Sequence, residues 1–387
     1  MDEQMSTTTK TEVLSKLRRR YASAGMEHKG KLIDQAVSLL GYHRKAAIRA
    51  LNGSTMVAIA IRTGRPREYE ARQLLPVLRQ IWRAANYPCG RRLKAMMPDW
   101  VSGYEEYEKS VSAAVKEPLL QASARTLDRL LRPLRAQRRR PNLTRPGSLL
   151  RRQIPIRGSL WEEGQAGWLE VDTVALCGGS VAGDFIWMVD AVDYVTAWVS
   201  VRAIWNRGQQ NTLSALQDME KTLPFALLGL DSDNGGEFLN YHVLRWLQQR
   251  PRPVFMTRSR PYKKDDNAHV EQKNWTHVRQ WFGYERYDNA DAVEPINELV
   301  RGPYAQLLNY FHANLKLERI ERQDGQLKKI YQDATTPLAR VLGCAEVSGK
   351  IKAHLRQHKS RLNPFALKVE VERRLKDIEK LRQQKNP

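Results

Sequence analysis

The chain has 387 residues, which is long enough for two or three domains and for at least one sizeable hydrophobic core. Its 64 Lys and Arg against 42 Asp and Glu give a net charge of +22, which indicates a polyanionic partner, nucleic acid first. No apolar run approaches the roughly 20 residues of a membrane-spanning helix, and the polar start MDEQMSTTTK lacks a signal-peptide core, so we expect a cytoplasmic, nucleoid-associated protein without membrane contact.

The three cysteines are widely scattered, at Cys89, Cys177 and Cys344. This spacing fits neither a disulfide framework nor a zinc site. We therefore expect each of them to be a small buried apolar residue without a chemical role.

Residues 1–60 are predicted to form a first helix-turn-helix DNA-binding domain. Two groups of apolar residues at helical spacing flank Gly41, which suits a tight turn because glycine tolerates positive φ. The second helix carries polar and basic residues, off its apolar side, that suit a major groove. A small helical hairpin with a solvated basic side fits the pattern equally well. The apolar residues are Ile33, Val37, Leu40, Ala47, Ile48 and Leu51, and the candidate DNA contacts are His43, Arg44, Lys45 and Arg49.

A short basic linker follows at residues 61–68. Its Gly64-Arg65-Pro66 core resembles an AT-hook, a minor-groove ligand whose arginines favour narrow A·T tracts. Arg65 is therefore a candidate DNA contact, although an ordinary interdomain linker is the simpler interpretation of so short a match.

Residues 69–136 are predicted to form a second helical, helix-turn-helix-like DNA-binding domain. In its last helix Ser123 is placed to cap the start, and four leucines repeat at helical spacing. The arginines lie mostly off the leucine stripe, which is typical of a recognition helix, and two such modules in tandem indicate a long bipartite DNA site. The stripe is Leu127, Leu130, Leu131 and Leu134, and the arginines are Arg125, Arg129, Arg132 and Arg135.

An Arg/Pro-rich linker is expected over residues 137–159. The stretch from Arg132 to Arg157 holds nine arginines, four prolines and no acid, and no packed core tolerates so much uncompensated charge. We expect an extended segment along DNA phosphates, with Arg138, Arg139 and Arg140 as contacts.

From residue 160 to residue 290 the pattern changes to that of an α/β domain. Runs rich in Val, Ile, Trp and Phe predict three sequential strands, after which helix and strand alternate. That order is typical of an RNase H-like core with a mixed five-stranded sheet. The expected strands are 167–177, 184–192, 196–204, 225–233 and 253–260, and the expected helices are 208–223, 237–250 and 266–283.

Three acids fall where this topology brings strand ends together. Asp172 lies in the first strand, Asp233 at the end of the fourth, and Glu271 in the first turns of the helix after the fifth. The Asn-Gly-Gly sequence after Asp233 accepts positive φ and lets the strand turn sharply. A cluster of carboxylates in a basic chain requires a cation, and Mg²⁺ or Mn²⁺ prefers such oxygen ligands, so we expect about two metal ions per active site.

Other residues compete for the same roles. Glu170 shares the strand face of Asp172, Asp231 shares that of Asp233, and Asp190 and Asp193 lie on or just past the second strand. Any of these acids, taken alone, is more typically a solvated or paired side chain. Around the third acid, several residues suit substrate phosphates, although they also fit a plain polar loop: Arg258, Arg260, Lys263, Lys264, Lys273 and Asn274.

The sequences WLEVDT, SDNGGEF and AHVEQKN, in this order, resemble the three catalytic motifs of the DDE transposase and retroviral integrase superfamily, and in more detail those of bacterial insertion-sequence transposases with an integrase-type core. The resemblance implies Asp172, Asp233 and Glu271 as catalytic and metal-binding residues. It also implies cleavage at transposon ends, followed by attack of a 3′-hydroxyl on target DNA, by at least a dimer. The 37 residues between Asp233 and Glu271 slightly exceed the best-known integrase spacing, and the sequence lacks the His/Cys zinc module of retroviral integrases.

The remaining residues, 291–387, are predicted to form a mainly helical, basic C-terminal region without recognisable chemistry. Taken together, the motifs predict a transposase that binds terminal inverted repeats and that cuts and joins DNA with divalent metal ions. Two alternatives use the same fold. One is a structure-specific RNase H-like nuclease that cuts without joining, and the other is a mobile-element-derived DNA-binding regulator whose core is inactive.

Overall fold

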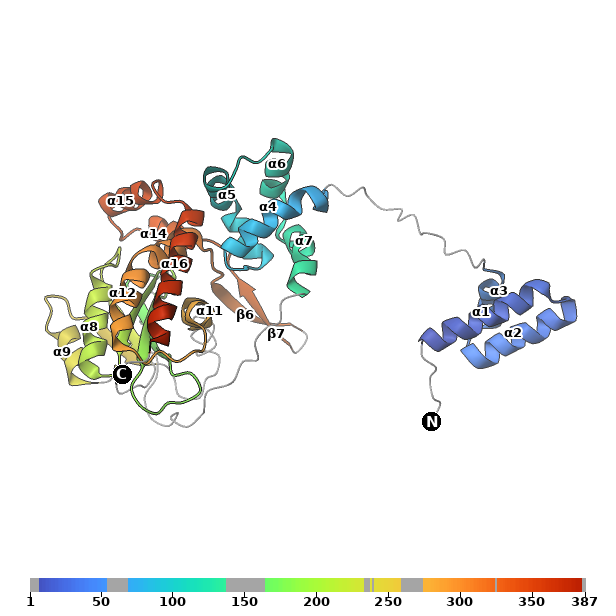
Figure 1. The fold of residues 1–387 in the computed structure, drawn as a ribbon, viewed down its shortest axis with the longest axis horizontal. Helices are drawn as coiled ribbons and strands as arrows, with labels where there is room; N and C mark the ends of the chain where they lie inside the picture. Colours follow the sequence, from blue (N-terminus) through green and yellow to red (C-terminus); the bar gives the residue numbers. More distant parts are fainter. Residues whose placement is uncertain are drawn as a thin grey trace. The chain divides into compact units, whose positions relative to one another are not determined.

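The computed structural model describes residues 7–53, 69–136, 164–232, 237–238, 240–258, 274–323 and 326–384. The chain divides into two compact units, Met1–Glu68 and Tyr69–Pro387, and the larger unit contains the sheet (Figure 1). Among the described residues, no helix combines the length and the apolar character needed to cross a membrane.

The smaller unit is built from three helices, α1 (Thr7–Ser23), α2 (Met26–Leu40) and α3 (Arg44–Asn52). The two helices expected around Gly41 are present, and Gly41 adopts the left-handed conformation with φ of 68°. The predicted apolar stripes are confirmed, since both helices contribute buried residues to one core. Helix α1 was not predicted, and it completes this core with residues such as Leu17.

Four helices open the larger unit. The last of them begins as predicted, because the Ser123 hydroxyl accepts a hydrogen bond from the Thr126 N–H at 3.1 Å. Its leucine stripe is also confirmed, with Leu127 and Leu131 fully buried. The four helices are α4 (Ala71–Ala84), α5 (Gly90–Tyr107), α6 (Ala113–Gln121) and α7 (Ala124–Ala136).

These four helices do not form a unit separate from the sheet, although we expected residues 69–136 to be a domain of their own. They share one hydrophobic core with the sheet and with the C-terminal helices. Trp100 Nε1 donates to the Phe311 carbonyl at 3.1 Å, and Arg92 Nε donates to the Ala313 carbonyl at 2.5 Å. Periodicity identified the buried sides of these helices, but their partners lie 211 and 221 residues further along the chain.

The predicted mixed five-stranded sheet is confirmed. Its strand order is β3-β2-β1-β4-β5, with β1 antiparallel to β2 and parallel to β4. This is the order of an RNase H-like sheet, and it brings the first and fourth strands side by side. The strands are β1 (Trp168–Ala175), β2 (Ile186–Asp193), β3 (Val199–Trp205), β4 (Gly229–Ser232) and β5 (Phe255–Arg258).

The two faces of the sheet have different covers, because side chains alternate along each strand. Leu169 and Val171 of β1 pack in one core with α8 (Gln209–Glu220) and α9 (Tyr241–Gln248). Val174 of β1 faces the opposite way, into the core that contains the C-terminal helices. Figure 1 shows α8 and α9 close together, and their buried residues belong to one core, whereas those of α12 and α16 belong to the other.

The elements after β5 are mostly short helices. A π-helical turn and a 3-10 turn come first, and a second π-helical turn lies between α13 and the hairpin. They are η2 (Trp275–Arg279), α11 (Gln280–Phe282), η3 (Ala290–Ala292), α12 (Val293–Arg301), α13 (Pro303–Gln306), η4 (Leu307–Phe311), β6 (Leu317–Gln323), β7 (Gln326–Tyr331), α14 (Pro337–Gly343), α15 (Gly349–Lys359) and α16 (Pro364–Gln383).

Within the C-terminal region, which is mostly helical as expected, the antiparallel pair β6 and β7 was not predicted. The sequence did carry a signal for it, since Asp324-Gly325 is a typical hairpin dipeptide between two β-prone runs. The runs LERIERQ and QLKKIY contain many charged residues, which are typical of a solvated helix, so we did not predict strands there.

The cysteines also differ from expectation. Cys177 and Cys344 are half-buried, whereas Cys89 is exposed. Cys89 is the N-cap residue of α5, and its side chain makes no capping hydrogen bond there. Burial raises the pKa of the Cys344 thiol to about 11, so this thiol stays protonated and unreactive at neutral pH.

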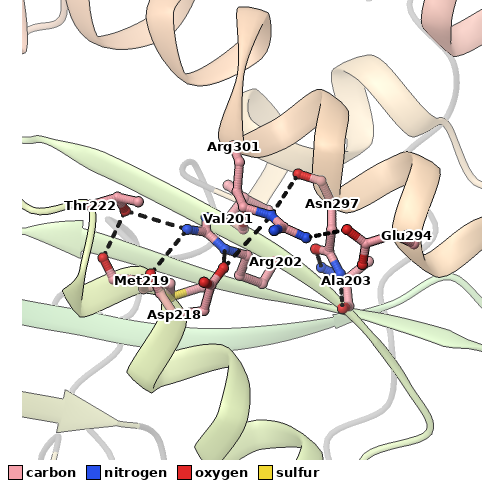
Figure 2. Close-up of polar contacts among 9 residues, drawn as sticks. All are labelled: Val201, Arg202, Ala203, Asp218, Met219, Thr222, Glu294, Asn297 and Arg301. Carbon is pink, nitrogen blue, oxygen red and sulfur yellow. Dashed lines mark hydrogen bonds and ion pairs between the residues drawn. The ribbon is translucent and has the colours of Figure 1, made fainter.

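Strand β3 lies at the edge of the sheet, and asparagine side chains satisfy its outward backbone groups. Asn297 on α12 accepts from the Ala203 N–H at 2.8 Å and donates to the Ala203 carbonyl at 2.9 Å (Figure 2). Asn309 in η4 makes the same pair of bonds with Val199, at 2.8 and 2.9 Å. Each side-chain amide thus makes the two hydrogen bonds that a neighbouring strand would make, so another strand cannot pair with β3 at these positions.

Arg202 anchors β3 to α8 from the other side of the sheet (Figure 2). It is 3% exposed, and its Nε donates to the Asp218 carboxylate at 2.7 Å. Burial opposes the ionisation of Asp218, but the hydrogen bond and charge of Arg202, together with the charge of Arg301 at 3.7 Å, more than offset it. The pKa of Asp218 is therefore lowered.

We expect Asn297→Leu to lower the free energy of unfolding by about 2–5 kcal/mol, because two buried backbone groups of Ala203 lose their partners. Urea denaturation of the full chain measures the change. Asn211→Leu is the matched control, since the Asn211 amide is exposed and donates one bond, to the Trp205 carbonyl at 2.7 Å. Its effect should stay below about 1 kcal/mol. Equal effects of the two substitutions would contradict the role given to Asn297.

The lowered pKa of Asp218 predicts a pH dependence of stability. A carboxylate with a depressed pKa stabilises the fold above its unfolded pKa, and this contribution is lost as the pH falls through the folded pKa. Asp218→Asn should therefore be less stable than the native chain near pH 6, and the difference should shrink toward about pH 3. Urea denaturation across this pH range measures it, and a constant difference would contradict the assignment.

Candidate functional site

Acidic side chains of neighbouring strands lie on one face of the sheet. Asp172 of β1 is paired in register with Asp190 of β2. Two residues earlier on β1, Glu170 is paired with Asp231 of β4. Because side chains two apart share a face, all four carboxyl groups belong to the face that also carries Val174. A chain of net charge +22 therefore concentrates negative charge at this part of its sheet.

Asp172 is held by a side-chain amide from beyond β5. Asn274 donates from Nδ2 to Asp172 Oδ2 at 2.5 Å, and the Thr173 N–H donates to Oδ1 at 2.7 Å. The Asn274 Oδ1 atom is buried and has no hydrogen-bond partner in the part of the chain that the structure describes. Asn274 thus serves as a donor that fixes the rotation of the carboxylate. DNA contact by Asn274 stays a prediction, but its amide faces the sheet rather than open solvent.

Asp190 is paired with a histidine three residues after Asn274. His277 Nδ1 lies 3.0 Å from Asp190 Oδ2, and the two side chains are 14% and 2% exposed. The Tyr304 hydroxyl donates to the His277 carbonyl. The Asp190 Oδ1 atom is buried and has no hydrogen-bond partner among the described residues. His277 belongs to the π-helical turn η2, which turns its side chain toward Asp190.

Asp193, a competing acid in the sequence, has a structural role. It is 1% exposed and accepts hydrogen bonds from the Gly167 N–H at 2.7 Å and from the Thr196 N–H and hydroxyl at 2.6 Å each. Burial raises the pKa of Asp193, against the effect of these bonds. Its carboxylate oxygens therefore serve the turn between β2 and β3.

Asp231, another of the competing acids, bridges two strands. It is 5% exposed, and the Thr257 hydroxyl on β5 donates to its Oδ1 at 2.8 Å.

Glu237 is an acid near the site that sequence reasoning missed. Its side chain is 2% exposed and lies 3.3 Å from the Arg207 guanidinium. The Thr173 hydroxyl, one residue after Asp172, donates to its Oε1 at 3.0 Å, and its Oε2 is buried with no hydrogen-bond partner within the described ranges. The available signal was its position inside SDNGGEF, directly before the fully buried Phe238. Glu237 thus ties the end of that motif to β1.

Of the residues predicted for the active site and its surroundings, the structure brings together Asp172 and Asn274. No cluster of three or more His, Cys, Asp or Glu able to hold a metal ion lies within the described ranges. The chemistry of the carboxylate row nevertheless fits a hard divalent cation, which prefers carboxylate oxygens. The predicted residues outside the described ranges are Arg65, Arg138, Arg139, Arg140, Asp233, Arg260, Lys263, Lys264, Glu271 and Lys273, and for Arg258 the backbone alone is described.

In the smaller unit, the candidate DNA contacts lie on and before α3. His43, Arg44, Lys45 and Arg49 are all exposed, as their position off the apolar stripe requires. His43 precedes the helix and accepts from the Lys45 N–H at 3.4 Å. Arg44 forms an ion pair with Asp34 of α2, so a phosphate would compete with an internal partner there.

In the larger unit, α7 presents an arginine-lined groove of about 500 Å³. Arg125, Arg129 and Arg132 are exposed along it. Arg135 is half-buried and forms an ion pair with Asp128 at 2.6 Å. The arrangement leaves three guanidinium groups facing an anion-sized opening.

Two substitutions separate structural acids from the candidate catalytic acid. Asp193→Asn should lower the free energy of unfolding by about 1–3 kcal/mol, because an amide must then face a donor, the Gly167 N–H or the Thr196 groups. Asp172→Asn should change it by less than about 1 kcal/mol, since Asn274 can turn its amide and offer Oδ1 instead. Urea denaturation of both variants tests this, and the reverse order of effects would contradict it.

No protein-family model matches the chain. The chain is similar to the solved catalytic core domain of BIV integrase, with 15% sequence identity and a TM-score of 0.26, over 38% of this chain and 86% of that chain. It is also similar to the HTLV-2 integrase catalytic core domain in complex with magnesium, with 14% sequence identity and a TM-score of 0.28, over 42% of this chain and 94% of that chain. It is 33% identical over 352 residues to the uncharacterized protein y4rM of Sinorhizobium fredii (strain NBRC 101917 / NGR234), covering 88% of this chain and 97% of that protein. The chain therefore belongs to the same protein family as y4rM.

Proposed function

We propose that the chain is a DNA transposase that binds terminal inverted repeats and cuts and joins DNA with divalent metal ions. The observation that carries the proposal is the row of carboxylates on adjoining strands of an RNase H-like sheet, with Asp172 held in its centre by Asn274. A row of this kind is costly without a cation. The basic character of the rest of the chain supports DNA as the substrate.

In this proposal Asp172, Asp233 and Glu271 hold Mg²⁺ or Mn²⁺. The metal would supply an acidified water or 3′-hydroxyl and would offset charge on the phosphate. Asn274 keeps the Asp172 carboxylate in one orientation, so that its oxygens do not have to be reorganised when substrate binds. The Asp190 and His277 pair holds the helix that carries Asn274 against β2.

DNA recognition would come from exposed basic side chains outside the sheet. The candidates are α3 in the smaller unit and the arginine-lined groove of α7, together with the two basic linkers. At least two copies of the chain act on DNA in this proposal, because two transposon ends are processed. A bacterial nucleoid is the corresponding location.

The test supplies labelled duplexes that carry the genomic sequences flanking the gene, a supercoiled acceptor plasmid, and Mg²⁺, Mn²⁺ or EDTA. We expect nicking at a defined 3′ end and a joined product with either metal and neither with EDTA. Asp172→Asn, Asp233→Asn and Glu271→Gln should each lower the yield of joined product by at least about 10³-fold while DNA binding is kept. Asp184→Asn, an exposed acid paired with Asn206, is the control that should keep activity.

Different failures would point to different functions. Cleavage without joining, even with paired ends, would favour a nuclease. Specific binding without cleavage in either metal would favour a DNA-binding regulator. Activity retained in the Asp172→Asn variant would remove Asp172 from the catalytic set.

A further inference from the structure

Helix α15 carries a concentration of positive charge that the proposed active site does not use. Its sequence is GKIKAHLRQHK, and no acid occurs between Glu346 and Glu370. Over the same stretch the chain has six Lys and Arg residues and two histidines. Figure 1 shows α15 at the edge of the larger unit. The charged residues are Lys350, Lys352, Arg356, Lys359, Arg361 and Lys368.

Two of these cations have internal partners. Lys359 forms an ion pair with Asp99 of α5 at 2.7 Å, and Lys368 forms one with Glu372 at 3.2 Å. Lys368 also lies over the Trp281 ring, 4.5 Å from its centre. These two side chains therefore belong to the packing of the unit and are not available to a partner molecule.

Three others are exposed, and the sixth, Lys352, is half-buried. Lys350, Arg356 and Arg361 form no ion pair within the described part of the chain, although Asp99 and Glu106 line the same groove as Arg356. We call Lys350, Arg356 and Arg361 the α15 surface. Lys350 and Arg356 are six positions apart in the helix, roughly 9 Å at about 1.5 Å per residue, and Arg361 lies two residues past the helix end. A duplex presents about five phosphates over 9 Å, at one charge per ~1.7 Å.

The next helix in the chain, α16, neutralises its basic residues with its own acids. Arg373 and Arg374 both pair with Glu370, at 2.8 and 2.6 Å, and Lys380 pairs with Asp377 at 2.9 Å. The hydrogen bonds from these two arginines lower the pKa of Glu370 to about 2. Helix α15 contains no acid of its own, and Asp99 of α5 pairs with Lys359, so the charge of Lys350, Arg356 and Arg361 is left for an external anion.

We propose that the α15 surface binds the phosphate backbone of duplex DNA. Helix α15 has no Phe, Tyr or Trp to stack on unpaired bases, and its Leu355 is buried in the protein's own core. Its exposed large apolar side chain, Ile351, is 38% exposed, and one such residue does not make the apolar face of a membrane-surface helix. Exposed lysine and arginine without aromatic residues suit sequence-independent phosphate contacts.

The test measures binding of the full chain to a random-sequence duplex in EDTA by fluorescence anisotropy over a series of KCl concentrations. Lys350→Gln, Arg356→Gln and Arg361→Gln are combined in one variant. The slope of log K against log salt should become shallower by about 2.7, since each lost phosphate contact removes about 0.9. Because EDTA prevents metal-dependent chemistry, the result does not depend on whether the proposed transposase activity is found.

The matched control combines Arg373→Gln, Arg374→Gln and Lys380→Gln, which removes the same charge from α16. Its slope should change by less than about 0.9, because these cations are already neutralised. An unchanged slope in the α15 variant would overturn the proposal, as would equal changes in both variants, which would show an effect of net charge alone. A second variant with Lys350→Glu and Arg361→Glu should give at least the loss of two contacts, and a native thermal unfolding midpoint confirms folding of each variant.

Discussion

The open edge of β3 is the constraint on which the larger unit depends. A strand paired on one side leaves N–H and carbonyl groups that need partners, and water cannot supply them once helices cover the sheet. Asn297 and Asn309 supply them from segments that follow the sheet in the chain. The C-terminal helices are therefore part of the sheet's hydrogen bonding, and through their shared core they also hold α4–α7 in place.

The acids of this strongly basic chain are held by different kinds of partner. Asp218 is paired with arginine and Asp193 accepts three hydrogen bonds at a turn, so both stabilise the fold. Asp172 accepts a hydrogen bond from the side-chain amide of Asn274, which fixes the direction of its carboxylate.

Much of the fold was predictable from periodicity. The strand runs, the buried leucines of α7 and the left-handed Gly41 each follow from local sequence, because each depends on a repeat or on one residue's backbone preference. The hairpin β6–β7 was not predicted. Its strands contain too many charged residues to show a clear alternation of apolar and polar side chains, and we did not use the Asp324-Gly325 dipeptide as a turn signal.

The candidate site was predictable in part. Asp172 could be named from its strand and motif, but the partner of its carboxylate is 102 residues away and no local pattern specifies it. The same holds for Asn297 and Asn309, which meet their strand 94 and 110 residues from it in sequence. Glu237 was quoted within its motif and still overlooked, since burial of an acid is decided by the residues packed around it rather than by its neighbours in the chain.

The closure of β3 has a consequence for how such a chain can evolve. The segment expected to be the catalytic core ends at residue 290, before α12, so it contains neither asparagine that completes its own sheet. A gene fusion that exchanged this segment alone would create a protein with an unsatisfied strand, ready to pair with other chains. The segment that must stay together in evolution is therefore longer than the expected catalytic core. It also includes the C-terminal helices that carry the amides of Asn297 and Asn309.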